Sequence, residues 1–168
     1  MSNAGPVPSR RRPPLARWIR LRVVLVSGMG MDIAKPPGRL LLVSPRHTLA
    51  DLADAIDTAF ARWDLSHLHL FRIGDDEYIR DPEDPGEHDS NESRIGDLHL
   101  RAGTKFTYVF DLGDDWTHEC TVEATDADPE ELLGGVPPQP VPFYGWGSIP
   151  DEYGREADED EDEEPDAE

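Results

Sequence analysis

The sequence predicts a single α+β domain, in which a mixed, mainly antiparallel sheet packs against one main helix. Three observations support this prediction. The chain has 168 residues, enough for one ordinary domain. Several segments alternate apolar and polar residues with the period of two that is typical of strands. One segment, residues 48–63, instead repeats its apolar residues with helical spacing.

The first half of the predicted domain contains two strands and the helix. Residues 18–26, WIRLRVVLV, alternate in the manner of a strand, and a loop ending in Pro-Pro-Gly separates them from a short strand at residues 39–43. Thr48 is expected to cap the helix in a capping box. Asp54 and Asp57 are expected on its water face. The predicted apolar face of the helix consists of Leu49, Leu52, Ala53, Ile56, Ala59, Phe60 and Trp63.

The second half is predicted to contain a covered strand and a tight hairpin. Residues 67–73, HLHLFRI, are apolar on both faces, so we expect a strand that is covered on both sides. Residues 74–93 are interpreted as a long acidic loop with two Asp-Pro breaks. Strands at 105–111 and 116–125 are joined by a turn in which Gly113 is expected to supply a positive φ. This order of elements resembles a β-grasp arrangement.

The charge of the chain is unevenly distributed. Its formal net charge is -20, yet residues 1–16 are rich in proline and arginine and are predicted to be a disordered leader. Residues 154–168 are predicted to be a disordered acidic tail, which leaves residues 17–153 as the domain. Residues 23–125 contain 9 bases and 20 acids, which argues against a general nucleic-acid groove. DNA association is therefore expected only through an N-terminal arm of Arg10, Arg11, Arg12, Arg17, Arg20 and Arg22.

The sequence also predicts the compartment. No apolar run approaches the roughly 18 residues that a membrane-spanning helix needs, and the N-terminus lacks a signal-peptide core. The single cysteine excludes an internal disulfide. We expect a soluble, cytoplasmic protein with no membrane partner.

The segment DLGDDWTHEC, residues 111–120, contains most of the chemically versatile side chains. Strand alternation places His118 and Cys120 beside Trp116 on the buried face, and aspartates are favoured in turns because they accept backbone hydrogen bonds. The segment therefore favours a structural role. A Cys–His nucleophile pair is disfavoured because a buried sulfur near Glu119 is a poor thiolate. A carboxylate-pair hydrolase is disfavoured because a turn provides no cleft.

A metal site is the main alternative. His67 and His69 would lie on one strand face about 7 Å apart, at roughly 3.3 Å per residue. With His118 or a carboxylate of the turn they would complete a site for zinc or another divalent metal. This alternative predicts a metal-binding protein or a metal-dependent hydrolase. No other cofactor is expected.

We favour a non-catalytic binding protein with a protein partner. Residues 141–153 contain more aromatic side chains than a linker needs, so these either pack on the sheet or contact a partner. The acidic surface suits a basic protein. The candidate binding residues are Asp111, Asp114, Asp115, Trp116, Glu119, Phe143, Tyr144 and Trp146.

About half of the chain resembles the plasmid pRiA4b ORF-3-like family. The resemblance is carried by two segments, TLADLADAIDTAFARWDLSHLHLFRI and KFTYVFDLGDDWTHECTVE. The family pattern is a Thr-Leu-x-x-Leu helix ending in Trp, a His-Leu-His-x-Phe strand and a Tyr-x-Phe-Asp-x-Gly-Asp-Asp-Trp-x-His-Glu hairpin. The matching positions are Thr48, Leu49, Leu52, Trp63, His67, Leu68, His69, Phe71, Tyr108, Asp111, Gly113, Asp114, Asp115, Trp116, His118 and Glu119.

The chain departs from this pattern in two places. KPPGRLLLV keeps the family's prolines but lacks the tryptophan that usually follows them, and the usual C-terminal segment is reduced to GGVPPQPVPFYGWGSIPDEYG. The resemblance implies a small, mostly bacterial protein with no established reaction. Because some members are labelled as passengers of insertion sequences, it also implies an accessory protein of plasmids or mobile elements.

Overall fold

The computed structural model describes residues 17–62 and 64–152. The predicted leader, the acidic tail, Trp63 and Tyr153 lie outside the described residues. The described part forms one sheet of nine strands with two short α-helices and a 3₁₀ turn at Ile95–Leu98. The elements are β1 (Trp18–Gly28), β2 (Met31–Asp32), β3 (Gly38–Val43), α1 (Leu49–Ala59), β4 (His69–Ile73), β5 (Asp76–Ile79), β6 (Glu87–Asp89), β7 (Lys105–Phe110), β8 (Trp116–Ala127), α2 (Pro129–Leu133) and β9 (Val141–Trp146).

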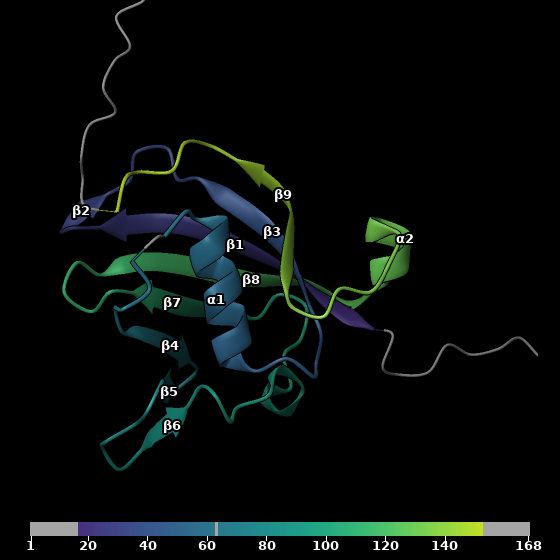
Figure 1. The fold of residues 1–168 in the computed structure, drawn as a ribbon, viewed down its shortest axis with the longest axis horizontal. Helices are drawn as coiled ribbons and strands as arrows, with labels where there is room; N and C mark the ends of the chain where they lie inside the picture. The colour runs from purple at the N-terminus through teal and green to yellow at the C-terminus, as the bar shows by residue number, and fades with distance from the viewer. Residues whose placement is uncertain (1–16, 63, 153–168) are drawn as a thin grey trace, which may run out of the picture.

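The strand order is β6-β5-β4-β7-β8-β1-β3-β9, with β2 paired to β1 (Figure 1). Neighbouring strands are antiparallel except β5 and β6, which run parallel. The α+β class and the mainly antiparallel sheet are therefore confirmed, although sheet predominates over helix. The β-grasp-like arrangement stays a prediction. No helix in the described residues is long and apolar enough to cross a membrane.

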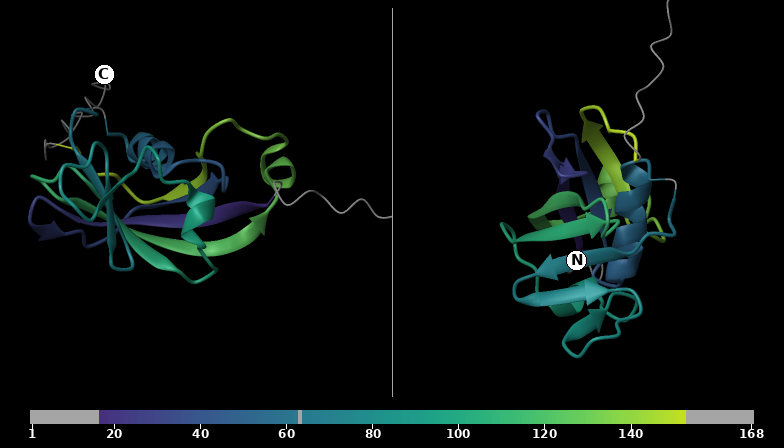
Figure 2. Two further views of the ribbon diagram at one scale, coloured as in Figure 1. Left: turned by 90° about the horizontal axis from the view of Figure 1, so that it is seen from below. Right: turned by 90° about the vertical axis from the view of Figure 1, so that its left-hand side faces the viewer.

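Helix α1 lies across one face of the sheet (Figure 2). Its apolar residues belong to the same buried cluster as those of β1, β7 and β8. The capping box is present, because the Thr48 hydroxyl accepts from the Asp51 amide at 3.1 Å and the Asp51 carboxylate accepts from the Thr48 amide at 2.9 Å. The helix ends at Ala59, earlier than predicted, because Ala61 adopts φ 55° and the Arg62 amide donates back to the Asp57 carbonyl.

Two strand predictions need correction. Strand β4 begins at His69, and residues 67 and 68 precede it rather than belonging to it. The acidic segment 74–93 is not a plain loop, because it contains β5 and β6. Tyr78 of β5 pairs with Phe71 and is 8% exposed. The apolar stretch around Tyr78 is too short to show alternation, so the sequence pattern did not reveal the strand.

The hairpin of β7 and β8 is confirmed, with Phe110 opposite Trp116 and Tyr108 opposite His118. Every second side chain of β8 from Trp116 to Val122 is buried, as alternation predicted. The same alternation leaves the remaining side chains of β8 on the opposite face of the sheet. We call this face, which lies away from α1, the outer face.

Candidate functional site

The hairpin turn is organised by one carboxylate. Asp111 is 8% exposed, and its Oδ1 accepts from the amides of Gly113 at 2.9 Å and Asp114 at 3.3 Å. Asp111 and Asp115 adopt φ 61° and 52°, whereas Gly113 is not among the residues with positive φ. The prediction for Gly113 is therefore wrong: Asp tolerates the left-handed region when its side chain bonds the local backbone.

The roles of Gly113 and Asp111 in the turn can be tested by substitution. Gly113→Ala is expected to lower the free energy of unfolding by less than about 1 kcal/mol, because no positive φ is required there. Asp111→Ala is expected to lower it by about 1–3 kcal/mol, because two amides lose their acceptor. Urea denaturation of both variants measures the difference. A larger effect at Gly113 than at Asp111 would contradict this assignment of the turn.

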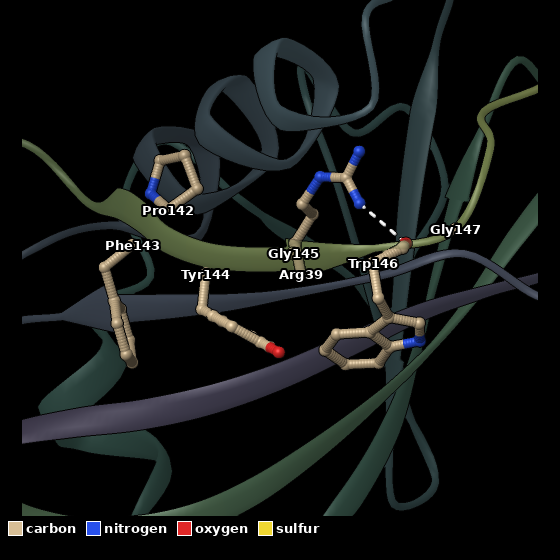
Figure 3. Close-up of a pocket in the computed structure, with 7 residues that line it drawn as sticks. All are labelled: Arg39, Pro142, Phe143, Tyr144, Gly145, Trp146 and Gly147. Carbon is tan, nitrogen blue, oxygen red and sulfur yellow. Dashed lines mark hydrogen bonds between the residues drawn. The ribbon is translucent and has the colours of Figure 1, made fainter.

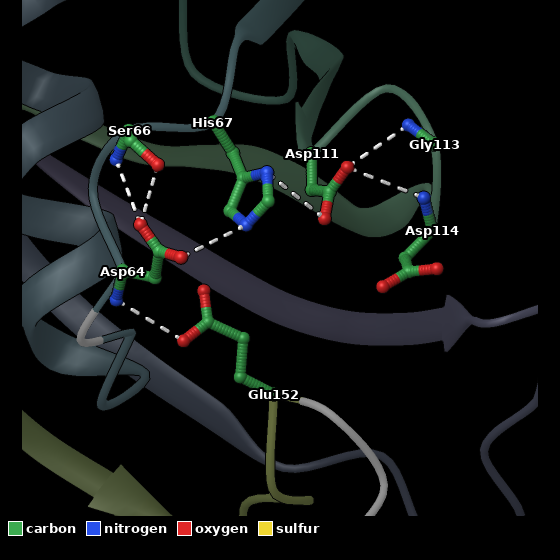
Figure 4. Close-up of polar contacts among 7 residues, drawn as sticks. All are labelled: Asp64, Ser66, His67, Asp111, Gly113, Asp114 and Glu152. Carbon is green, nitrogen blue, oxygen red and sulfur yellow. Dashed lines mark hydrogen bonds and ion pairs between the residues drawn. The ribbon is translucent and has the colours of Figure 1, made fainter.

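His67 connects the turn to two other segments (Figure 4). Its Nδ1 lies 3.3 Å from Asp111 Oδ2, and its Nε2 lies 3.5 Å from Asp64 Oδ2. The Asp64 amide in turn donates to Glu152 Oε2 at 3.2 Å. An imidazole between two carboxylates thus ties the hairpin to the chain after α1 and to the C-terminal end of the described residues. The sequence pattern indicated His67 and Asp111 but missed Asp64 and Glu152.

The other two candidate histidines have different surroundings. His69 is 5% exposed and its Nε2 lies 3.0 Å from the Ser90 hydroxyl, and burial, reinforced by Arg80, lowers the pKa of His69 to about 4. His118 is fully buried and donates from Nδ1 to the Tyr108 carbonyl at 3.2 Å. Burial, reinforced by Arg62, lowers its pKa to about 3. Over residues 17–62 and 64–152 no three His, Cys, Asp or Glu side chains are placed to hold a metal ion.

Cys120 is buried beside His118 in the sheet core. Burial raises the pKa of its thiol far above the ordinary value. A thiol that stays protonated and has no access to solvent is a poor nucleophile. The geometry thus agrees with the sequence argument against a Cys–His pair.

A buried polar pair that no sequence pattern indicated lies between α1 and the sheet. The Tyr108 hydroxyl donates to Asp57 Oδ1 at 2.6 Å. Asp57 is 5% exposed, so its expected place on the water face is wrong. Burial, only partly offset by the bond from Tyr108, raises the pKa of Asp57 to about 7. This carboxyl changes charge near neutral pH.

Arg62 is a further buried polar residue, close to the end of α1. Its side chain is 4% exposed, and its guanidinium lies 4.5 Å from the centre of the Trp116 ring. None of its side-chain nitrogens has a hydrogen-bond partner within the described part of the chain. Trp116 is itself 3% exposed, so this candidate binding residue belongs to the core and presents no surface to a partner.

The aromatic residues of β9 lie elsewhere. Phe143, Tyr144 and Trp146 project to one side of the strand, while Pro142 and Arg39 project toward α1 (Figure 3). A register shift between β3 and β9 explains how the neighbours Phe143 and Tyr144 share a side. Tyr144 is 62% exposed, and the rings of Tyr144 and Trp146 are 6.2 Å apart.

The Trp146 ring is held in place on the outer face. It covers Gly38, where an added Cβ would lie 2.0 Å from the ring, and the Arg22 guanidinium lies 4.5 Å from the ring centre. Strand pairing joins Trp146 to Gly38, Gly38 to Val24 and Val24 to Glu119. Paired residues point to the same face of a sheet. We name the resulting surface the outer-face patch; it consists of Arg22, Val24, Leu40, Glu119, Tyr144 and Trp146.

Two of the arginines assigned to the predicted DNA-binding arm belong to the sheet. Arg20 and Arg22 belong to β1; Arg20 donates to Glu123 at 3.0 Å, and Arg22 stacks on Trp146. They are therefore sheet residues rather than part of an arm. Arg10, Arg11 and Arg12 lie outside the described residues.

The chain matches known proteins in two comparisons. The sequence profile described as plasmid pRiA4b ORF-3-like protein matches residues 20–152. The crystal structure of a protein of unknown function from Methanosarcina mazei Go1 is similar, with a TM-score of 0.63 and 18% identity, over 79% of this chain and 72% of the other. At that identity the similarity shows the fold alone. No curated protein matches the chain.

Proposed function

The chain belongs to the plasmid pRiA4b ORF-3-like family, and from the geometry of its surface we propose that it is a non-catalytic interaction protein. The description of the family names a plasmid reading frame and no reaction. We therefore place the protein among the cytoplasmic accessory proteins of plasmids or other mobile elements. Its task in this proposal is to bind another protein.

The outer-face patch is the observation that carries the proposal. Tyr144 is 62% exposed beside Trp146, on a strand that forms the edge of the sheet. Exposed aromatic rings held on a rigid strand lose little conformational freedom on binding, and Tyr, Trp and Arg dominate the energetics of interfaces. Arg22 and the backbone of Gly38 already fix the Trp146 ring, so this part of the surface is preorganised.

Charge indicates the type of partner. The chain contains 36 acidic and 16 basic residues. Glu119 of the patch is paired with Lys105 at 3.3 Å, whereas Asp114 and Asp115, in the turn that precedes β8, add negative charge beside the start of that strand. Complementary charge favours a basic protein and raises the rate of association.

The chemically reactive side chains support catalysis less well than the outer-face patch supports binding. A catalytic group must reach its substrate. His118, Cys120 and Asp57 are each at most 5% exposed, and none of them lines the surface hollows at β9, beside α1 or beside β5. His67 is more accessible, and it lies between two carboxylates, those of Asp64 and Asp111, which makes it part of the polar contacts that hold the turn.

The proposal is tested by comparing the proteins that the wild-type chain and the Tyr144→Ser variant capture. We expect a positively charged protein to be retained by the wild-type chain and to be retained about tenfold less by Tyr144→Ser, since central aromatic residues contribute 1.4 kcal/mol or more. Quantitative mass spectrometry of proteins captured from host extract measures this ratio. The matched control is Leu132→Ser on α2, where the leucine is 44% exposed and does not belong to the patch. Equal capture by both variants would refute the outer-face patch as the binding surface.

A further inference from the structure

A surface hollow lies at the opposite side of the sheet from β9. It encloses about 430 Å³ between the start of β4, the end of β5 and the hairpin turn. In the strand order, β4 and β5 are separated from the outer-face patch by β7. We name it the leucine–acid pocket; its lining residues are Leu68, His69, Ile79, Arg80, Asp81, Glu83, Asp84, Glu87 and Leu112.

Two exposed leucines form the apolar wall. Leu68 is 61% exposed and Leu112 is 43% exposed. The Asp111 amide donates to the Leu68 carbonyl at 2.9 Å, so the backbone holds the two leucine-bearing segments side by side. Neither leucine belongs to the buried core cluster. A ligand with an aliphatic group would therefore remove apolar surface from water at this place.

Four carboxylates form the other wall. Glu87 Oε2 accepts from the amides of Glu83 at 3.2 Å and Asp84 at 3.1 Å, which gives the acidic loop a defined shape. The one arginine of the lining, Arg80, donates to Asp54 of α1 at 3.3 Å, so its charge is already paired. Burial keeps the pKa of His69 near 4, so His69 adds no positive charge at neutral pH. The pocket is therefore strongly negative.

We propose that the leucine–acid pocket binds an extended protein segment in which at least two Lys or Arg residues flank a Leu, Ile or Met. The cationic side chains would pair with the carboxylates of the loop, and the aliphatic side chain would cover Leu68 and Leu112. A metal ion fits less well, because no three acidic side chains of the described residues are placed around a common point. The pocket and the outer-face patch share no residue, so an experiment can refute the proposal for one surface without refuting the proposal for the other.

A defined peptide tests the pocket in the full-length protein. The probe is a fluorescein-labelled peptide GLRRLRG, with GSRRSRG as the control for the leucines, titrated by fluorescence anisotropy at about 0.15 M salt to screen distant charges. The pocket variants are the pairs Leu68→Ser with Leu112→Ser and Glu83→Gln with Asp84→Asn. The matched controls on α2 are Leu132→Ser with Leu133→Ser and Glu130→Gln with Glu131→Gln, all at exposed positions.

We expect each pocket pair to weaken binding about tenfold and each control pair to change it less than about twofold. GSRRSRG should bind about tenfold more weakly than GLRRLRG to the wild-type protein. Residues 154–168 attract either peptide equally in all variants, so they cannot produce this pattern. Amide shifts on peptide addition should centre on Leu68, Leu112 and residues 81–87, a readout that does not depend on any variant.

Three results would overturn the proposal. The first is equal weakening by the pocket and control pairs, which would show attraction to the net charge alone. The second is a set of amide shifts that leaves the pocket unaffected. The third is self-association of the wild-type chain, measured by sedimentation, that the pocket pairs abolish; this would make a second copy of the chain the occupant.

Discussion

Replacing Trp116 with alanine is expected to lower the free energy of unfolding by about 3–5 kcal/mol, as for other large buried side chains. The ring is 3% exposed and contacts two groups. One is the backbone of Gly28, where an added Cβ would be 2.0 Å from the ring. The other is the Arg62 guanidinium, 4.5 Å from the ring centre. The variant therefore gains a cavity and also loses the surface on which a buried cation rests.

Denaturation by urea or guanidinium chloride measures this effect. The matched control is Tyr144→Ala, which removes a large aromatic residue at a position that is 62% exposed. We expect the control to change the free energy of unfolding by about 0.5 kcal/mol or less, as is usual at exposed positions. A loss below about 1 kcal/mol for Trp116→Ala would mean that the ring does not stabilise the core.

The residues that the sequence placed correctly are those whose environment follows from a local pattern. The strands around the hairpin have an apolar residue at every second position, so alternation alone assigned Trp116, His118 and Cys120 to the core. The capping box at Thr48 is equally local, because it depends on two residues three positions apart.

The residues that were missed depend on contacts between distant segments. Asp57 was expected to face water because it is charged, yet the hydroxyl that bonds it comes from Tyr108, 51 positions later. Asp64 meets Glu152 across 88 positions. Helical spacing describes one element and contains no information on which strand or terminus will cover it, so no pattern in residues 48–63 could have identified the buried pair.

The outer-face patch illustrates the same limit for a binding surface. Glu119, Tyr144 and Trp146 were among the expected binding residues, but the sequence could not show that they share a face. That result requires the register of four neighbouring strands, from β8 through β1 and β3 to β9. Register depends on pairing over long separations, and a shift by one residue would reverse the face of every side chain.

At about pH 8, Asp57→Asn is expected to raise the free energy of unfolding by about 1–3 kcal/mol, since one unit of pKa shift corresponds to about 1.4 kcal/mol. Burial raises the pKa of Asp57 from 3.8 to about 7, so the folded protein contains a buried carboxylate above neutral pH. An asparagine in the same place carries no charge and still accepts from the Tyr108 hydroxyl. The amide therefore removes the penalty of burying a charge and keeps the hydrogen bond.

The direction of the pH dependence follows from the pKa. Because the pKa of Asp57 is higher in the folded than in the unfolded state, the folded state binds this proton more tightly, and the stability linked to it is lost as pH rises from about 4 to about 7. His69 and His118 act in the opposite direction. Their pKa values of about 4 and about 3 lie below the ordinary 6.5, so the stability linked to the neutral imidazoles is lost as pH falls below 6.5. On acidification these two histidines therefore destabilise the folded state, whereas Asp57 stabilises it.

The difference between Asp57→Asn and wild type isolates the carboxyl, because both proteins contain the same histidines. Measured by urea denaturation, this difference should be smallest near about pH 4 and should increase to its full value by about pH 8. Glu131→Gln is the matched control, because that side chain is exposed on α2 and is not among the groups that shift the pKa of Asp57. The control is expected to change the free energy of unfolding by about 0.5 kcal/mol or less, as is usual at exposed positions. A constant difference for Asp57→Asn would show that the carboxyl is already ionised at pH 5, and that the bond from Tyr108 outweighs burial.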